Sequence, residues 1–166
     1  MNKSKLLWMC AGLLLAIGLG SCSSDDDSWG SRNQFQPNQG GLCKTWQLIG
    51  YGSEENFHMI DEEYRQLSDV FGYRFYLVFN SDGTFTGRES VNTIFGEYTC
   101  TGSQINIGDL ETTYIYDAKG YDESMAFLNH LRSAKSYGIK DYVQLRIYYS
   151  DTEFLYFRVI EMEELG

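Results

Sequence analysis

Hydrophobic and polar positions alternate with a period of two in several stretches after residue 44. The clearest stretch holds Phe75, Leu77 and Phe79, and the turn sequence Ser-Asp-Gly at 81–83 follows it. Alternation on both sides of such a turn predicts a β-hairpin over 73–89. The same pattern predicts four more segments: a first strand over 44–51, a hairpin over 94–108 around Gly102, a strand over 112–117 and a final hairpin over 143–159.

Two segments show helical spacing instead. The first predicts a short helix over 61–71, with Asp61 as a candidate N-cap and Gly72 at its end. Its apolar positions are Tyr64, Leu67, Val70 and Phe71. The second predicts an amphipathic helix that starts near Asp122, a candidate cap, with Gly138 marking its end or the loop after it. Phe127 and Leu131 lie four residues apart on its apolar face.

These elements predict a mainly β fold with one or two short helices. About seven or eight short strands follow one another, mostly through tight turns, and the longer helix is inserted late. A meander of this kind loses its exposed edges by closing on itself. We therefore expect a small curved antiparallel sheet or barrel with the late helix against one opening.

The first 21 residues have the composition of a secretory signal. Lys3 and Lys5 precede an uncharged apolar run over 6–20, which is shorter than the ~20 residues of a membrane-spanning helix. The run ends in Leu-Gly-Ser-Cys, which resembles a bacterial lipobox. The resemblance implies lipidation of Cys22, cleavage before it and attachment to the outer membrane; the alternative is a buried cysteine in an uncleaved helix.

Residues 22–41 read as a polar tether that follows the anchor. The run Asp25, Asp26 and Asp27 resembles the acidic sorting signal of surface lipoproteins of the Bacteroidetes type, which implies a cell-surface location. The alternative is a solvated linker, because like charges repel and stay extended, on a protein that faces the periplasm. The packed domain is then expected over 42–166.

The net charge limits the classes of partner that the protein can bind, and the composition supports the predicted fold. Removing 1–21 takes away two lysines and no acidic residue, so the formal net charge changes from −10 to −12. Such a charge excludes ordinary nucleic-acid binding, which needs a basic surface. Aromatic residues make up 16% of the chain, with thirteen tyrosines, and this composition favours strands.

Two cysteines remain beyond the anchor, Cys43 and Cys100. An oxidising compartment permits a disulfide between them, worth roughly 3–4 kcal/mol in the loop-entropy picture. Two buried thiols are the alternative.

Several spaced residues resemble the META domain of bacterial envelope lipoproteins, over about 42–160. The matching positions are Leu42, Trp46 and Leu48; Asn92, Gly96 and Tyr98; Ile105, Ile107, Gly108 and Thr112; and Phe127, Leu131, Tyr137, Leu145 and Leu155. The resemblance implies a small β-rich envelope protein, in some members linked to stress tolerance, and supplies no catalytic residues.

The sequence also departs from the META pattern. Lys44 replaces a glycine, Val91 and Tyr116 replace two cysteines found in many members, and 53–72 is longer. A lipocalin-like lipoprotein domain, which also begins with a Trp-x-Leu strand, is therefore the alternative family.

No recognised catalytic or phosphate-binding motif is present. His58 lies near Asp61, Glu62 and Glu63, but acidic residues at a helix start are explained by the helix dipole. His130 lies mid-helix. We therefore predict no enzyme activity, cofactor or metal.

The aromatic residues give the best candidates for binding. Trp46, Tyr98 and Tyr114 are candidate ligand-facing aromatics, and cross-strand packing in the core is the alternative. We expect a structural or interaction module with an outer-membrane protein or glycan partner. The alternative is a carrier of a sugar or lipid-like ligand, which requires a hollow interior rather than a filled one.

Overall fold

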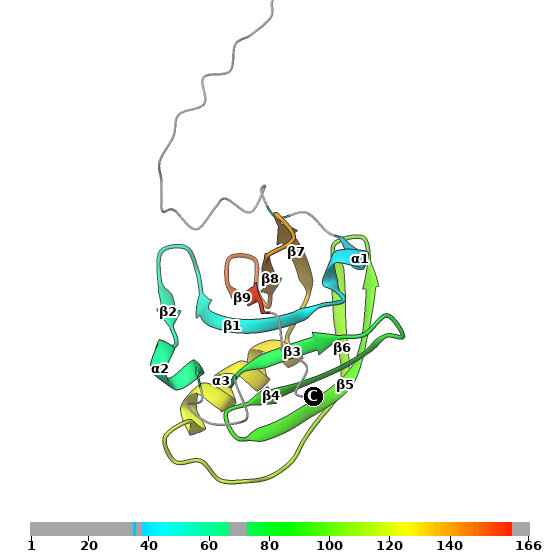
Figure 1. The fold of residues 1–166 in the computed structure, drawn as a ribbon. Coiled ribbons are helices and arrows are strands. Elements are labelled where there is room, and N and C mark those ends of the chain that lie inside the picture. The colour runs from blue at the N-terminus through cyan, green and yellow to red at the C-terminus, as the bar shows by residue number, and fades with distance from the viewer. Residues whose placement is uncertain (1–34, 36–37, 67–72, 161–166) are drawn as a thin grey trace, which may run out of the picture.

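The computed structural model describes residues 35, 38–66 and 73–160, with only the backbone of 39 and 40 (Figure 1). The helices are α1 (Gln39–Leu42), α2 (Glu62–Arg65) and α3 (Tyr121–Arg132). The strands are β1 (Thr45–Gly52), β2 (Phe57–Met59), β3 (Tyr76–Phe79), β4 (Thr84–Glu89), β5 (Asn92–Thr101), β6 (Gln104–Thr112), β7 (Ser136–Lys140), β8 (Gln144–Tyr148) and β9 (Phe154–Val159). No helix in these ranges is long and apolar enough to cross a membrane.

The strands form one antiparallel sheet that closes on itself. β1 pairs with β9 along one edge, and with β3 and then β2 along the other. The order β1-β3-β4-β5-β6-β7-β8-β9 therefore returns to β1, with β2 added beside it. The predicted mainly β fold with a curved, closing sheet is confirmed.

Turn residues explain why the predicted hairpins form. Asp82 Oδ1 accepts hydrogen bonds from Thr84 N at 2.9 Å and Thr84 Oγ1 at 2.7 Å. Gly83, at φ +86°, takes the left-handed conformation that this turn needs. Gly102, at φ +58°, does the same between β5 and β6.

Side chains fill the interior of the barrel. The largest apolar residues there are almost completely buried: Trp46, Phe75, Phe79, Phe85, Phe127 and Phe157. α3 contacts β4, β6 and β9, which lie on different sides of the ring, so it covers one opening (Figure 1). Its Phe127 ring lies 6.1 Å from that of Phe75 and 6.2 Å from that of Phe157.

The early helix is shorter than the spacing predicted. α2 ends at Arg65, and Gln66 is extended and forms a β-bridge with Tyr73. Asp61 flanks the helix without a side-chain cap hydrogen bond. Leu67, Val70 and Phe71 lie outside the described residues.

Three predictions in the second half are wrong. The segment 113–117 is not a strand: after Thr113, which still donates to the carbonyl of Thr93 in β5, the backbone N–H and carbonyl of Ile115 bind the side chain of Asn92. Gly138 does not end the late helix; α3 stops at Arg132, and Gly138 lies within β7. Asp122 lies in the first turn of α3 and is not its cap, which is Gly120.

Packing also reaches into the stretch predicted as a tether. Phe35 is buried with Ile49, Tyr148, Phe154 and Tyr156 in a cluster of its own on the barrel surface. A Cβ added to Gly138 would lie 2.6 Å from Phe35 Cβ, so only glycine allows this approach.

Candidate functional site

The predicted anchor and sorting residues, Cys22 and Asp25–Asp27, lie outside the described residues. Their roles therefore stay predictions.

Two of the three candidate ligand-facing aromatics belong to the core. Trp46 has no exposed surface, and its Nε1 donates to the carbonyl of Leu42 at 2.8 Å. Tyr98 is buried, and its hydroxyl donates to the carbonyl of Asn80 at 2.6 Å. The prediction that they face a ligand is wrong. Both side chains point into the barrel from their strands and pack with the other side chains that fill its interior. Tyr114, in contrast, is 92% exposed.

Cys43 and Cys100 are not joined by a disulfide in the structure. Both are partly buried, and Cys43 Sγ lies 3.9 Å from the Tyr98 hydroxyl. Burial raises the pKa of the Cys100 thiol. Of the two alternatives that the sequence allowed, a disulfide or two thiols, the structure therefore has two thiols beside the core.

Both histidines lie in one cluster between β2 and α3. His58 Nε2 is 2.7 Å from Glu123 Oε1, and the Tyr51 hydroxyl donates to Glu123 Oε2 at 3.1 Å. His130 stacks on Tyr149 at 3.9 Å, and burial lowers its pKa. The partner of His58 is thus Glu123 rather than its acidic neighbours in sequence. In the described ranges no three His, Cys, Asp or Glu residues gather as a metal site.

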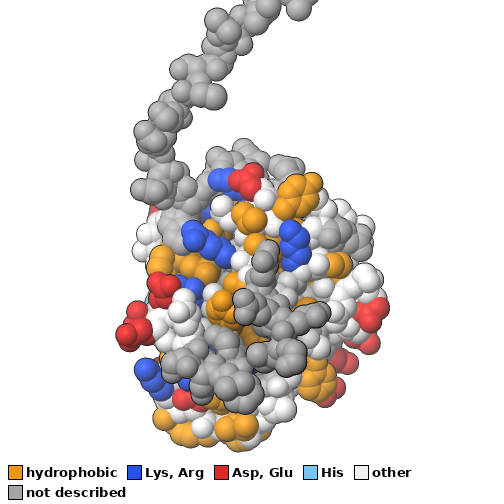
Figure 2. Space-filling view, in the orientation of Figure 1, with side chains coloured by type: hydrophobic (Ala, Val, Ile, Leu, Met, Phe, Trp, Pro, Cys, Tyr) orange, Lys and Arg blue, Asp and Glu red, His pale blue; other side chains and the backbone are white. Residues whose placement is uncertain are grey.

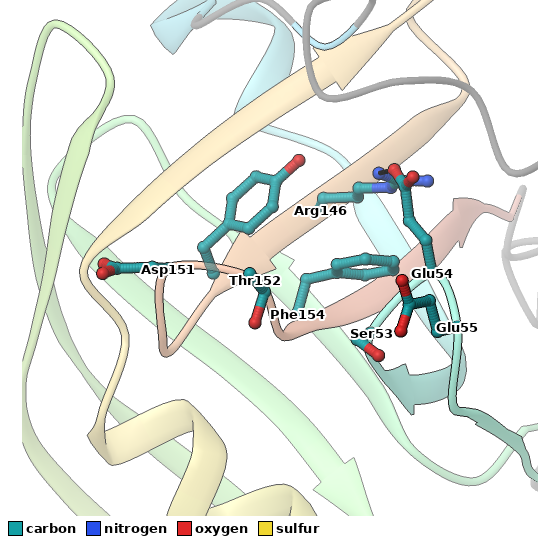
Figure 3. Close-up of a pocket in the computed structure, with 8 residues that line it drawn as sticks. Ser53, Glu54, Glu55, Arg146, Asp151, Thr152 and Phe154 are labelled. Atoms are coloured by element: carbon teal, nitrogen blue, oxygen red, sulfur yellow. Dashed lines mark hydrogen bonds and ion pairs between the residues drawn. The ribbon is translucent and has the colours of Figure 1, made fainter.

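A cavity of about 430 Å³ lies on the outside of the barrel, between the β1–β2 and β8–β9 turns. We call it the Arg146 cavity, and Figure 3 shows its lining, which includes Glu54, Glu55, Arg146, Asp151, Thr152 and Phe154. Volume alone makes it a candidate for ligand binding.

The buried Arg146 of this cavity has a structural role, because it contacts side chains from three separate segments. It is 1% exposed, and its Nη1 lies 3.0 Å from Glu54 Oε1. Its guanidinium carbon lies 4.0 Å from the centre of the Phe154 ring and 4.3 Å from that of Phe35. A cation between two rings is stabilised by both π faces. Arg146 therefore fastens the Phe35 segment to the barrel.

A second cavity, of about 100 Å³, lies where the β4–β5 hairpin end meets the segment 113–117 and α3. We call it the Glu89 cavity. Glu89 and Asn92 pair across the end of the hairpin, and Glu89 Oε1 accepts from Asn92 Nδ2 at 2.8 Å. Glu89 is 4% exposed, and among the described residues its Oε2 has no hydrogen-bond partner. Glu89, which lines the cavity, thus has a buried carboxylate oxygen without a donor among the described residues.

Asn92 holds the outer wall of the Glu89 cavity. Its Oδ1 accepts from the backbone N–H of Ile115 at 2.6 Å and from Thr113 Oγ1 at 3.2 Å. Its Nδ2 also donates to the carbonyl of Ile115 at 3.0 Å. Asn92 therefore makes three of the hydrogen bonds that hold the segment 113–117.

Asp117 supplies a second carboxylate at the cavity. It accepts hydrogen bonds from the Tyr64 hydroxyl at 2.8 Å, from the Ser90 hydroxyl and from the backbone N–H of Lys119 at 3.1 Å. Burial raises the pKa of Asp117, but these hydrogen bonds outweigh burial and the net pKa is lowered. Asp117 is therefore ionised at neutral pH.

Large exposed side chains surround the Glu89 cavity. They are Tyr114, Ile115, Tyr116, Tyr121 and Met125, which we call the tyrosine surface. Figure 2 shows hydrophobic side chains gathered along the lower edge of the molecule, where Figure 1 places the segment between β6 and α3. Contiguous exposed apolar groups commonly mark interaction sites.

Sequence reasoning missed Glu89, although a signal was present. Phe85, Gly87 and Glu89 share one face of β4, and all three are buried. A carboxylate in phase with a buried strand face is unusual. The alternation therefore marks Glu89 as a buried acid, while its contact with α3 depends on tertiary structure.

Comparisons with known proteins agree with this fold. A family model described as META domain matches residues 42–160. A DUF4847 family protein from Bacteroides vulgatus aligns with a TM-score of 0.54 at 18% identity, covering 74% of this chain and 96% of that one. A protein from Burkholderia xenovorans aligns with a TM-score of 0.59 at 17% identity, covering 86% and 99%. Comparison with curated sequences gives no match.

Proposed function

The chain belongs to the META domain family, and on this basis we propose that it is a lipid-anchored protein of the outer envelope that acts by binding. The tyrosine surface is the contact face, and its occupant is a neighbouring envelope protein that presents a basic segment. The family match supports the META alternative over the lipocalin-like one.

The observation that carries the proposal is a filled barrel beside a cluster of exposed aromatic residues. Phe127 from α3 and the inward side chains of the strands occupy the interior of the barrel. A carrier would need a hollow interior for its ligand, so this filling favours the interaction module. Tyr114 and Tyr116 project from a segment held by Asn92 and are largely exposed. Tyrosine gives a large contact area with little loss of conformational entropy, and it is enriched at interfaces.

Charge favours a basic partner. The chain carries a formal net charge of −10, and two carboxylates, Glu89 and Asp117, border the centre of the tyrosine surface. No Lys, Arg or His lines this cavity among the described residues. Complementary potentials speed association and exclude unsuitable partners.

The tether would keep this surface close to the membrane. The stretch from Cys22 to Phe35 spans at most ~45 Å when fully extended. Aspartates near anionic head groups favour an extended tether. A partner within this distance of the lipid surface is therefore accessible to the domain.

A crosslinking experiment in intact cells tests the proposal. A photoreactive residue at position 116 should capture an envelope protein, and capture should fall when Tyr114→Ala and Tyr121→Ala are added. Tyr142→Ala is the matched control, because Tyr142 is also exposed but lies between β7 and β8.

The captured protein is then purified, and its basic segment is replaced with neutral residues. Loss of binding on that replacement supports the proposal. Equal capture by the Tyr114→Ala and Tyr142→Ala variants, or binding of a glycan without any protein, would overturn it.

A further inference from the structure

We propose that the Glu89 cavity is a receptor for a primary ammonium group, which donates a hydrogen bond to Glu89 Oε2. The inference rests on the proposed function, since it assigns the ammonium to a lysine side chain of the protein bound at the tyrosine surface.

The first argument is the unsatisfied oxygen. Buried polar groups in folded proteins nearly always have hydrogen-bond partners, and a charged group without one is costly. Glu89 Oε1 is engaged by Asn92 Nδ2, whereas Oε2 has no donor among the residues the structure describes. A ligand that donates a hydrogen bond therefore removes a cost that the fold otherwise carries.

The second argument is charge. Glu89 and Asp117 both line the cavity, and hydrogen bonds keep Asp117 in its anionic form. The neighbouring Lys119 ammonium lies 5.4 Å from the centre of the Tyr64 ring, outside the lining of the cavity. The aromatic rings of Tyr114, Tyr116 and Tyr121 add π faces that attract cations.

The third argument is size and shape. A volume of about 100 Å³ is enough for an ammonium group and its first methylenes. Guanidinium prefers a bidentate contact with both oxygens of a carboxylate. Because Glu89 Oε1 is already occupied by Asn92, the compact ammonium of lysine fits better than the fork of arginine.

A divalent metal is a poorer fit. Ca²⁺ takes six to eight oxygen ligands. Within the described ranges no group of three or more acidic, His or Cys residues is placed to hold a metal.

The test titrates n-butylammonium into the full-length protein and follows backbone amide NMR shifts. Binding should shift the amides of Glu89, Asn92 and Ile115. Glu89→Gln should weaken it about tenfold or more, the effect expected for a lost charged hydrogen bond. Glu97→Gln, which removes the same charge from an exposed position of β5, should change the affinity less than twofold.

Three further ligands define the chemistry. Neutral 1-butanol and tetramethylammonium, which has no N–H donor, should bind at least tenfold more weakly than n-butylammonium. Ca²⁺ should leave the same amides unshifted. Equal binding of 1-butanol, equal affinity of the Glu89→Gln variant, or Ca²⁺ shifts at these amides would overturn the proposal. If Glu89→Gln fails to fold, Glu89→Asp, which keeps the charge but shortens its reach, replaces it and should also weaken binding.

The outcomes separate this inference from the proposed function. If n-butylammonium binds but no partner is captured, the docking proposal fails and the ammonium site remains. If the partner is captured equally by Glu89→Gln and the unchanged protein, the docking proposal stands and the ammonium site is refuted.

Discussion

Ile115 and Asn92 are joined by two hydrogen bonds that imitate strand pairing. The backbone N–H of Ile115 donates to Asn92 Oδ1 at 2.6 Å, and Asn92 Nδ2 donates to the carbonyl of Ile115 at 3.0 Å. A side-chain amide thus takes the place of a neighbouring strand. The consequence is an irregular segment that is nevertheless fixed against the hairpin end.

Replacing Asn92 with alanine should therefore release the segment 113–117. The change leaves the N–H of Ile115 and Glu89 Oε1 without partners at a buried site, which we expect to cost about 2–3 kcal/mol of unfolding free energy. Urea denaturation measures this loss. Thr99→Ala, at an exposed position of the same strand, should change stability by less than ~0.5 kcal/mol. Equal stability of both variants would contradict a structural role for Asn92.

The residues that match the META pattern have structural roles in this fold. Asn92 holds the segment 113–117, and the Tyr98 hydroxyl donates to the carbonyl of Asn80 at 2.6 Å. A Cβ on Gly96 would lie 2.3 Å from a carbonyl oxygen of β6, so the strand pair requires glycine. The barrel therefore uses these three matching residues for structure: Asn92 holds a segment, Gly96 allows close strand pairing, and Tyr98 bonds to a turn.

Acid should destabilise the protein partly through Asp117. Its pKa is lowered in the folded state, so the unfolded chain binds a proton more readily and folding is favoured above the ordinary value of about 4. This contribution is lost as the pH falls through the folded pKa. Tyr64→Phe removes one of the hydrogen bonds that lower that pKa, so the contribution of Asp117 should shrink.

Urea denaturation between pH 5 and pH 2 tests this expectation. Asp117→Asn should lose less stability on acidification than the unchanged protein, with Tyr64→Phe between the two. A steeper acid loss in Asp117→Asn would reverse the sign and refute the account.

The sequence predicted local structure better than tertiary placement. The Asp82–Gly83 turn and the alternation of Phe75, Leu77 and Phe79 depend on neighbours in the chain, so the hairpin was predictable. The segment 113–117 has the composition of a strand, but a side chain from β5 competes for its backbone.

The site depends almost entirely on long-range contacts. Glu89 meets the segment 113–117 and α3 only after the barrel has closed. Arg146 lies between the inward residues Leu145 and Ile147 of β8, so the pattern predicts that it is exposed on the outer face. In the structure Phe35 covers it, from a segment that the sequence predicted to be a tether. Periodicity assigns a residue to one face of a strand, but it does not show what covers that face.

The Phe35 contact predicts that stability depends on residues before 42. Phe35→Ala removes a buried ring from Arg146, and loss of a buried phenylalanine ring typically costs about 3 kcal/mol or more. A chain that begins at residue 42 should lose a similar amount relative to one that begins at residue 31. Urea denaturation compares the three proteins. Unchanged stability of the shorter chain would show that the barrel needs no such covering segment.

The anchor prediction concerns the part of the chain before this contact. Cys22→Ala should release the protein from membranes and abolish palmitate labelling, because a free hydrophilic domain has no lipid to hold it. Cys43→Ala, which lies in the packed domain, should remain in the membrane fraction. Membrane sedimentation of Cys22→Ala with continued labelling would refute the anchor.

If the acidic run directs sorting, its effect should depend on position and not on total charge. Replacing Asp25–Asp27 with alanine should reduce the fraction that protease removes from intact cells. The matched control replaces Asp61, Glu62 and Glu63, which removes the same charge from an exposed part of the folded domain. Because only the first variant changes the residues beside the lipid, only it should lose surface display. An equal loss in both variants would assign the effect to net charge, and no loss in either would leave the run as a solvated linker.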